Sequence, residues 1–163
     1  KELLNNNKLK LIYRPHPGDV RNNETNLFIK SIYEKYKDNK NFFLDDNTSY
    51  LDSYKRSKIL ITDFSGTAYT YAFSKLRPVI FFSKNEQELQ KSNFNELFFF
   101  KDRFEVGTVV QKIQNLNSEI NSLSKNIELN IEKIKTLRSN RIKFFNDSMN
   151  QNILHLKEIV KNK

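Results

Sequence analysis

The sequence predicts an α/β fold, built on a parallel sheet with helices on both faces and followed by long C-terminal helices. Short apolar, β-branched runs alternate with segments whose apolar residues recur every three or four positions, which is the pattern of strands and helices in turn. The run at 58–62 is almost continuously β-branched or Leu, as expected of a strand that is covered on both sides. Together these observations predict a Rossmann-like domain, half of a doubly wound fold.

Four strands are predicted, each from a short apolar run, at residues 9–13, 41–44, 58–62 and 79–82. The first run stops where prolines flank His16, and the third stops at Asp63, shortly before Gly66. Because a helix separates each strand from the next, the connections are expected to be right-handed crossovers and the sheet to be parallel.

Three helices are predicted between these strands, from about residue 24, through residues 50–54, and over residues 68–76. In the first, Phe28, Ile29 and Ile32 recur at helical spacing. Polar residues 46–49 offer N-cap side chains for the second. Pro78 ends the third, because proline cannot continue a helix.

Strand signals fade after Ser83. Residues 97–100 are read either as a short extra strand or as a buried aromatic clamp, and the pattern from Thr108 onward is helical. There the apolar residues alternate by three and four, at Ile113, Leu116, Ile120, Leu123, Ile127, Ile131 and Ile134. We expect two amphipathic helices that pack on the sheet or on another domain, with a self-associating coiled coil as the alternative. The predicted domains are 1–110 and 111–163.

Composition excludes several classes of protein. A chain of 163 residues with 37% hydrophobic content can bury one sizeable core. It has no Cys, and His16 and His155 lie far apart, so we expect no metal site and no cofactor. The apolar runs are far shorter than the roughly 20 residues that span a bilayer. Because the sequence opens at Lys1 without Met, we expect it to be part of a longer protein.

Positive charge is concentrated at one end of the chain. Residues 133–163 hold eight Lys or Arg against Asp147 and Glu158, and therefore carry +6 of the formal +9. This asymmetry favours an anionic partner, either a membrane surface or a phosphate-rich polymer, although an AT-rich coding sequence also enriches Lys. Nucleic acid is not expected, since no Gly-rich basic loop or aromatic RNA-binding signature accompanies the charge.

The first candidate cluster follows the first predicted strand and contains Arg14, His16 and Pro17. The flanking prolines restrict the backbone, so the imidazole is held out from the strand end. A protonated or hydrogen-donating imidazole at that edge can neutralise a diphosphate or a leaving group. We therefore assign His16 as catalytic and the other two as nucleotide- or phosphate-binding residues. The alternative is a loop histidine that packs against Pro17.

The second cluster lies at the turn from the third strand into a helix and contains Asp63, Ser65, Gly66 and Thr67. Helix N-termini offer unpaired N–H groups, so the last three residues can receive phosphate oxygens through backbone amides. Gly66 permits a close approach of the phosphate. Asp63 repels phosphate, so we expect it to orient the loop or His16, or to contact a ligand hydroxyl. Ser65 is equally compatible with ordinary N-capping.

These two motifs resemble those of the CDP-glycerol glycerophosphotransferases of teichoic acid and capsule synthesis. Members carry a strand ending in His-Pro, then an apolar strand with Thr-Asp-Tyr-Ser-Ser, a helix and Pro-Ile-Ile-Phe-Tyr. The counterparts here are His16-Pro17, residues 59–66 and residues 78–82. In this chain Phe64 replaces the tyrosine, Gly66 replaces the second serine, and the acidic residue after the last strand fits only with a shift, in Ser83-Lys84-Asn85-Glu86.

The resemblance, which covers about residues 9–110, implies the C-terminal half of a GT-B fold that holds the cytidine diphosphate of the donor. It implies transfer of glycerol phosphate from CDP-glycerol to a polymer or lipid-linked acceptor, with an N-terminal domain that completes the enzyme. The expected location is the inner face of a bacterial cell membrane, as a peripheral protein. The alternatives are a transferase using CMP-sugars or other nucleotide sugars, and a noncatalytic Rossmann-like scaffold.

Overall fold

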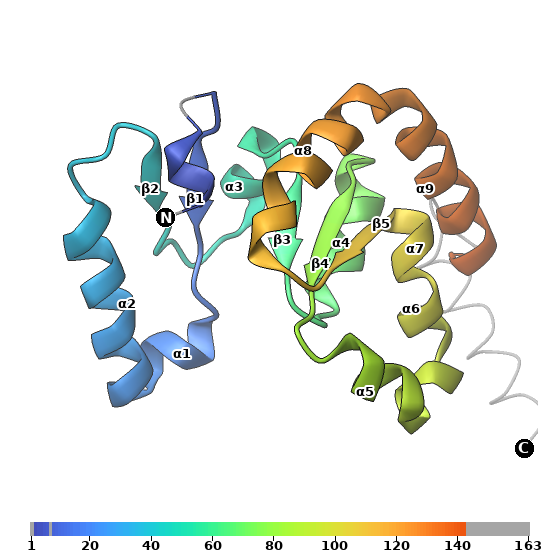
Figure 1. The fold of residues 1–163 in the computed structure, drawn as a ribbon, viewed down its shortest axis with the longest axis horizontal. Helices are drawn as coiled ribbons and strands as arrows, with labels where there is room; N and C mark the ends of the chain where they lie inside the picture. The colour runs from blue at the N-terminus through green and yellow to red at the C-terminus, as the bar shows by residue number, and fades with distance from the viewer. Residues whose placement is uncertain (1, 7, 143–163) are drawn as a thin grey trace, which may run out of the picture.

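The computed structural model describes residues 2–6 and 8–142 (Figure 1). Its strands are β1 (Leu11–Tyr13), β2 (Phe42–Leu44), β3 (Leu60–Thr62), β4 (Val79–Phe82) and β5 (Gly107–Val110). Its α-helices are α1 (Pro17–Arg21), α2 (Asn23–Tyr36), α3 (Leu51–Arg56), α4 (Thr67–Lys75), α5 (Glu86–Lys91), α6 (Phe98–Lys101), α7 (Arg103–Val106), α8 (Leu116–Lys125) and α9 (Ile127–Arg141). Short 3-10 helices are η1 (Leu3–Asn5), η2 (Asn93–Glu96) and η3 (Ile113–Asn115).

The predicted α/β class and the parallel pairing are confirmed, but the strands form two sheets instead of one. β1 pairs with β2, and β4 lies between β3 and β5, all in parallel register. β1 and β3 share no ladder; a cavity of about 620 Å³ lies between them. The four predicted strands stand where the sequence placed them, although the first three are shorter at their starts.

Side chains alternate across the three-stranded sheet and bury it on both faces. Val79 and Phe81 of β4 pack in a core cluster with residues of α4 and α9. Ile80, between them in sequence, packs in a second cluster with residues of α8. Because successive side chains of a strand point to opposite faces, β4 is enclosed by helices on each side. In β3, the strand predicted to be covered on both sides, Leu60 packs against the first cluster and Ile61 against the second, so both of its faces are covered.

The edge strand β5 corrects the expectation that the chain is helical from Thr108 onward. Gly107 begins this strand beside β4, and a Cβ built on it would lie 1.7 Å from the carbonyl oxygen of Val79. Only glycine permits the two backbones to come this close. The strand was missed because it is four residues long and its apolar residues run into the helical spacing that follows.

The two predicted C-terminal helices are present, and their apolar seam is divided between the two faces of the sheet. Leu116, Ile120 and Leu123 of α8 belong to one core cluster, whereas Ile134 of α9 belongs to the other. Helix α8 ends at Lys125, and its C-cap residue Asn126 separates the two sets. This division favours helices that pack on the sheet over a single coiled-coil stripe.

Residues 97–100 are not a strand, and they fit the alternative of a buried aromatic clamp only in part, because Leu97, Phe98 and Phe99 are exposed. They lead into α6, where Phe100 is buried and meets the ring of Phe64 edge-on at 5.3 Å between centroids. The ring of Phe99 stacks on Phe64 at 5.2 Å. Aromatic pairs at these separations stabilise a fold beyond the area that they bury. The clamp thus holds the loop after β3.

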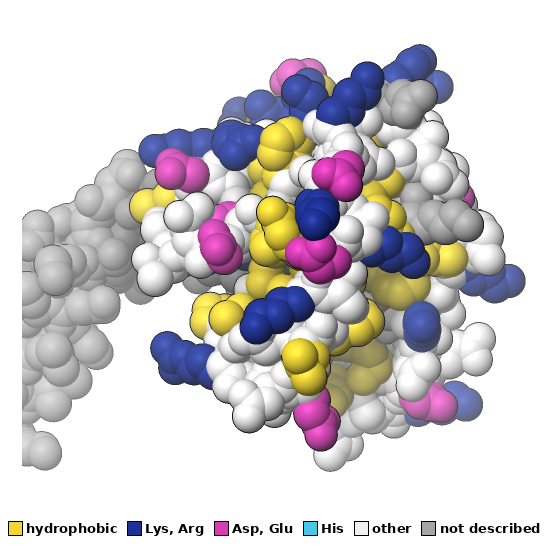
Figure 2. Space-filling model, turned by 90° about the vertical axis from the view of Figure 1, so that its left-hand side faces the viewer, with side chains coloured by type: hydrophobic (Ala, Val, Ile, Leu, Met, Phe, Trp, Pro, Cys, Tyr) yellow, Lys and Arg dark blue, Asp and Glu magenta, His cyan; other side chains and the backbone are white. Residues whose placement is uncertain are grey.

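Helix α2 exposes much of the apolar face that its spacing predicted. Ile29 is buried, but Leu27 and Phe28 are 68% and 63% exposed. Figure 2, which views this side of the molecule, shows hydrophobic side chains exposed among charged ones. Within the described ranges, no helix combines the length and the apolar character needed to cross a membrane.

Asp45, which follows β2, ties three elements together. Its carboxylate accepts hydrogen bonds from Arg14 Nη1 at 2.7 Å, from the Asn47 amide nitrogens and from the Ser53 hydroxyl in α3. Burial alone raises the pKa of Asp45, but the bonds from Ser53, Arg14 and Asn47 outweigh it and lower the pKa from 3.8 to about 2. The negative charge of Asp45 therefore stabilises this corner of the fold.

A buried ion pair joins α5 to α7. Arg103 is fully buried and donates to both carboxylate oxygens of Glu86, at 2.9 and 2.7 Å, while its Nε–H donates to the Phe100 carbonyl. The guanidinium also lies 3.5 Å from the centroid of the Phe100 ring. Burial alone raises the pKa of Glu86, but hydrogen bonds led by that from Arg103 lower it overall. The pair thus fixes the segment between β4 and β5.

The first prediction concerns acid stability. Because the pKa of Asp45 is lower in the folded chain, its contribution is complete above about pH 4 and is lost as the pH falls toward 2. Between pH 5 and pH 2, the unfolding free energy should fall by about 2 kcal/mol more in the parent than in Asp45→Asn. Urea unfolding at a series of pH values measures this difference. Asp46→Asn, at the exposed neighbouring residue, is the control and should behave like the parent.

The second prediction concerns the buried pair. Glu86→Leu or Arg103→Met should each cost about 3–5 kcal/mol of unfolding free energy, since either leaves a buried charge unpaired. The double variant should lose less than the sum of the two, because it leaves no buried charge. Glu132→Gln, which breaks an exposed pair with Lys135, should cost no more than about 1 kcal/mol. Equal losses in Glu86→Leu and Glu132→Gln would contradict this account.

Candidate functional site

The candidate site lies at the carboxyl edge of the strands, where the connections diverge. From β1 the chain crosses to β2 on one side, and from β3 it continues to β4 and β5 on the other. In Figure 1 the chain leaves β1 toward α1 and leaves β4 toward α5 at the same lower edge. The order β2-β1 and then β3-β4-β5 makes the gap between β1 and β3 a topological switch point. Ligands of open α/β sheets bind at such points.

His16 lies directly after β1 and caps α1. Its Nδ1 accepts the Gly18 N–H at 3.0 Å, and Pro17 occupies the first position of the helix. Since Nδ1 is an acceptor in this bond, a neutral imidazole carries its proton on Nε2. The side chain is exposed, so this N–H can donate to a ligand. His16 therefore combines an N-capping bond with a donor at the switch point, rather than only packing against Pro17.

The loop after β3 presents backbone amides at the start of α4. Ser65 Oγ accepts the Thr67 N–H at 3.4 Å, while the amides of Ser65 and Gly66 have no partner within the described part of the chain. Gly66 is exposed, and a Cβ built on it would meet no atom within 4 Å, so its Cβ side is open. Of the three amides expected to receive phosphate oxygens, two are thus available.

Thr67 and Asp63, on either side of these amides, form hydrogen bonds with nearby side chains. The Thr67 hydroxyl lies 3.0 Å from the hydroxyl of Tyr54 in α3. Asp63 is exposed, and its Oδ1 accepts a bond from the Thr62 hydroxyl at 3.3 Å. Asp63 makes no hydrogen bond to His16 among the described residues, so its expected contact with a ligand hydroxyl stays a prediction.

Arg14 is directed into the protein rather than toward open space. Its Nη1 meets Asp45, and its Nη2 donates to the Asn47 carbonyl at 2.8 Å and to the Thr48 carbonyl at 3.3 Å. With these bonds in place, Arg14 supports the strand end that carries His16. Direct phosphate binding by Arg14 stays a prediction and would require these bonds to open.

Glu86, which the sequence offers as the shifted counterpart of the family's acidic residue, is buried, and its carboxylate accepts hydrogen bonds from Arg103 and Gln90. The structure also draws attention to two residues that sequence reasoning did not assign to the site. Lys84 follows β4 at the same edge and is exposed, with no ion pair among the described residues. Its position directly after a strand was the one available signal. Tyr54, which contacts Thr67, lies 13 positions before it in the sequence, and no local sequence signal linked the two residues.

Metal ligands are not gathered at this edge. Across residues 2–6 and 8–142, no group of three or more His, Asp or Glu side chains is placed to hold a metal ion. The arrangement instead offers hydrogen-bond donors: the imidazole N–H of His16, two backbone amides and the positive end of the nine-residue helix α4. Such a set can bind an anion and stabilise negative charge that develops on it.

Comparison with known proteins agrees with this chemistry. The sequence model of the family described as CDP-Glycerol:Poly(glycerophosphate) glycerophosphotransferase matches residues 2–157. No curated protein and no solved structure matches the chain. The family match covers almost the whole sequence, including both loops of the switch point. The chain therefore belongs to the CDP-glycerol:poly(glycerophosphate) glycerophosphotransferase family.

Proposed function

We propose that the chain is the donor-binding half of a GT-B type transferase that moves glycerol phosphate from CDP-glycerol to a growing surface polymer. The observation that carries this proposal is that His16 and the free amides of Ser65 and Gly66 both follow the carboxyl ends of strands that flank a topological switch point. Both groups donate hydrogen bonds, as a diphosphate requires. The family match supports the choice of CDP-glycerol as the donor.

In this proposal the acceptor hydroxyl attacks the phosphorus that bears glycerol. A new bond forms between the acceptor oxygen and that phosphorus, and the bond to the oxygen shared with CMP breaks, so CMP leaves with the electron pair. A single in-line displacement inverts the configuration at phosphorus. The proton of the acceptor hydroxyl passes to a general base, which we assign to a further domain of the protein.

The residues of this chain act by stabilising the charge that gathers on the departing phosphate. The Nε2–H of His16 donates to it, and the amides at the start of α4 add two more donors. Phosphoryl transfer depends mainly on positioning and electrostatic stabilisation, which such donors supply. A donor role suits His16 better than an acid role, since protonating Nδ1 would break its bond with Gly18.

We also propose that the enzyme works at the inner face of the cell membrane, in teichoic acid or capsule synthesis. Of the four basic residues of α9, Lys133 is exposed and forms no ion pair among the described residues, and the other three are engaged within the chain. Arg141 pairs with Asp102, Lys135 pairs with Glu132, and Arg138 donates to the Phe73 carbonyl. Apart from Lys133, the remaining basic residues of this end of the chain fall in 143–163, which lies outside the described residues. Peripheral membrane binding therefore rests on the composition of that segment.

The third prediction tests the donor. The 163-residue chain should bind CDP and CDP-glycerol, because both retain the diphosphate, yet show no transfer without an acceptor domain. Calorimetric titration with CDP-glycerol, CDP, CMP, UDP and a CMP-sugar measures the preference. Tighter binding of the CMP-sugar would favour the nucleotide-sugar transferase, and binding of no cytidine nucleotide would favour a scaffold. Robust turnover by the chain alone would refute the half-enzyme proposal.

The fourth prediction separates the two roles of His16. An Asn side chain can take the place of Nδ1 and keep the cap, whereas a Gln side chain can place an amide N–H near Nε2. In the full-length enzyme, His16→Asn should therefore lower kcat on the order of 10²-fold while melting near the parent. His16→Gln should retain more activity and lose some stability. Steady-state kinetics and thermal melting measure both effects.

Ser65→Ala is the matched control for this pair. It leaves the backbone amides in place, so the loss should fall on donor affinity, at about 1 kcal/mol, and not on kcat. Equal loss of kcat in both His16 variants would point to an acid role for the imidazole. Parental kcat in His16→Asn would reduce His16 to a capping residue.

A further inference from the structure

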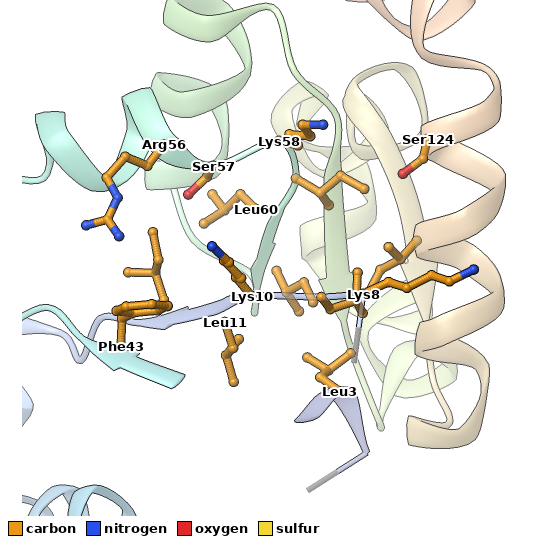
Figure 3. A pocket seen from close by; sticks show the side chains of 15 residues that line it. Leu3, Lys8, Lys10, Leu11, Phe43, Arg56, Ser57, Lys58, Leu60 and Ser124 are labelled. Atoms are coloured by element: carbon orange, nitrogen blue, oxygen red, sulfur yellow. The ribbon is translucent and has the colours of Figure 1, made fainter. Parts of the chain in front are cut away.

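A second basic site lies on the opposite edge from His16. The cavity of about 620 Å³ between β1 and β3 is lined by residues that open each strand, such as Lys10 and Lys58 (Figure 3). His16 and Ser65 instead follow the carboxyl ends of the same strands. We propose that this cavity binds the poly(glycerophosphate) chain at a distance from the transfer site and holds it between transfers. The idea rests on the proposed function.

The charge of the cavity supports an anionic ligand. Lys8, Lys10, Arg56 and Lys58 line it, and its lining contains no Asp or Glu. None of these four cations forms an ion pair among the described residues. Four uncompensated positive charges around one recess repel each other, and a bound anion relieves that repulsion.

The spread of the charges fits a repeating anion better than a single phosphate. In Figure 3 the Lys10 ammonium lies between the strands below Ser57. The Arg56 guanidinium lies on the side of Phe43, and Lys8 extends toward the helix that carries Ser124. A phosphodiester chain offers one negative charge per repeat and can meet such separated cations in turn.

Two open strand edges add hydrogen-bonding groups to this recess. The amide of Leu11 bonds to Asn41 of the β2 side, and that of Leu60 bonds to Pro78 of the β4 side. Peptide groups alternate in direction along a strand, so those of Ile12 and Ile61 turn to the other edge, toward the cavity. Backbone groups that lack a ladder need other partners. Glycerol hydroxyls and phosphate oxygens provide them.

A nucleotide fits the recess poorly. Nucleotides bind beyond the carboxyl ends of parallel strands, whereas this cavity opens at their amino ends. The aromatic ring in its lining belongs to Phe43, and the Arg56 guanidinium already lies over it at 5.4 Å from the centroid. One of the two faces on which a base could stack is therefore already occupied.

The test is binding of a short, fluorescently labelled poly(glycerophosphate) to the 163-residue chain, followed by anisotropy. Lys8→Gln/Lys10→Gln/Lys58→Gln should weaken binding roughly tenfold, equivalent to about 1.4 kcal/mol. The matched control, Lys30→Gln/Lys91→Gln/Lys133→Gln, removes the same charge from exposed, unpaired lysines elsewhere and should change binding less than about twofold. Ser124→Lys adds a cation beside the cavity and should tighten binding, independently of any loss of folding.

Four outcomes overturn the proposal. The first is an equal loss of binding in the two triple variants, and the second is no effect of Ser124→Lys. The third is displacement of the polymer by inorganic phosphate at a concentration equal to that of the phosphate groups in the polymer. The fourth is that anionic vesicles bind the cavity variant more weakly than the parent, by the same factor as the polymer. CDP binding is measured separately on each variant and should stay at the parental level. If the parent binds the polymer but not CDP, only the donor site is refuted. If the parent binds CDP but not the polymer, only the cavity proposal is refuted.

Discussion

Burial of β4 on both faces is the constraint on which the rest of the structure depends. Its alternate side chains require α4 and α9 on one side and α8 on the other, and its two edges position β3 and β5. Because β3 is held by this pairing, its carboxyl end presents the loop of Ser65 and Gly66 at a fixed edge. The position of the amides proposed to bind phosphate therefore follows from the packing of an apolar strand.

Both loops of the candidate site are supported from behind by groups that face away from the ligand. Arg14 and Asp45 connect the end of β1 to the end of β2 and to α3. Phe64 is clamped by the rings of Phe99 and Phe100, and Arg103 lies against Phe100 while it binds Glu86. Charged and aromatic contacts thus fix the backbone, while the imidazole of His16 and the free amides stay exposed. Preorganised donors of this kind stabilise developing charge without reorganising.

Because the two sheets are separated, the strands β1 and β3 present different groups at their carboxyl ends and at their amino ends. At the carboxyl ends of β1 and β3 lie hydrogen-bond donors in a small number, suited to a diphosphate. At the amino ends lies a recess with four cations and open peptide groups, suited to a longer anion. An enzyme that extends a polymer needs to hold its product as well as its donor. In the arrangement proposed here, strands shared by both sites keep the two at a constant separation.

By itself the sequence determined the α/β class, the four strands, the two C-terminal helices and the two loops at the carboxyl edge, because each depends on local apolar spacing or on a nearby Pro, Gly or Ser. Only the tertiary structure decided that the sheet divides between β1 and β3, that Gly107 opens a fifth strand, and that Glu86 pairs with Arg103. Those features depend on contacts between residues distant in the chain, whose pairing leaves no local pattern. The role of Arg14 as a support was likewise decided by Asp45, 31 positions away.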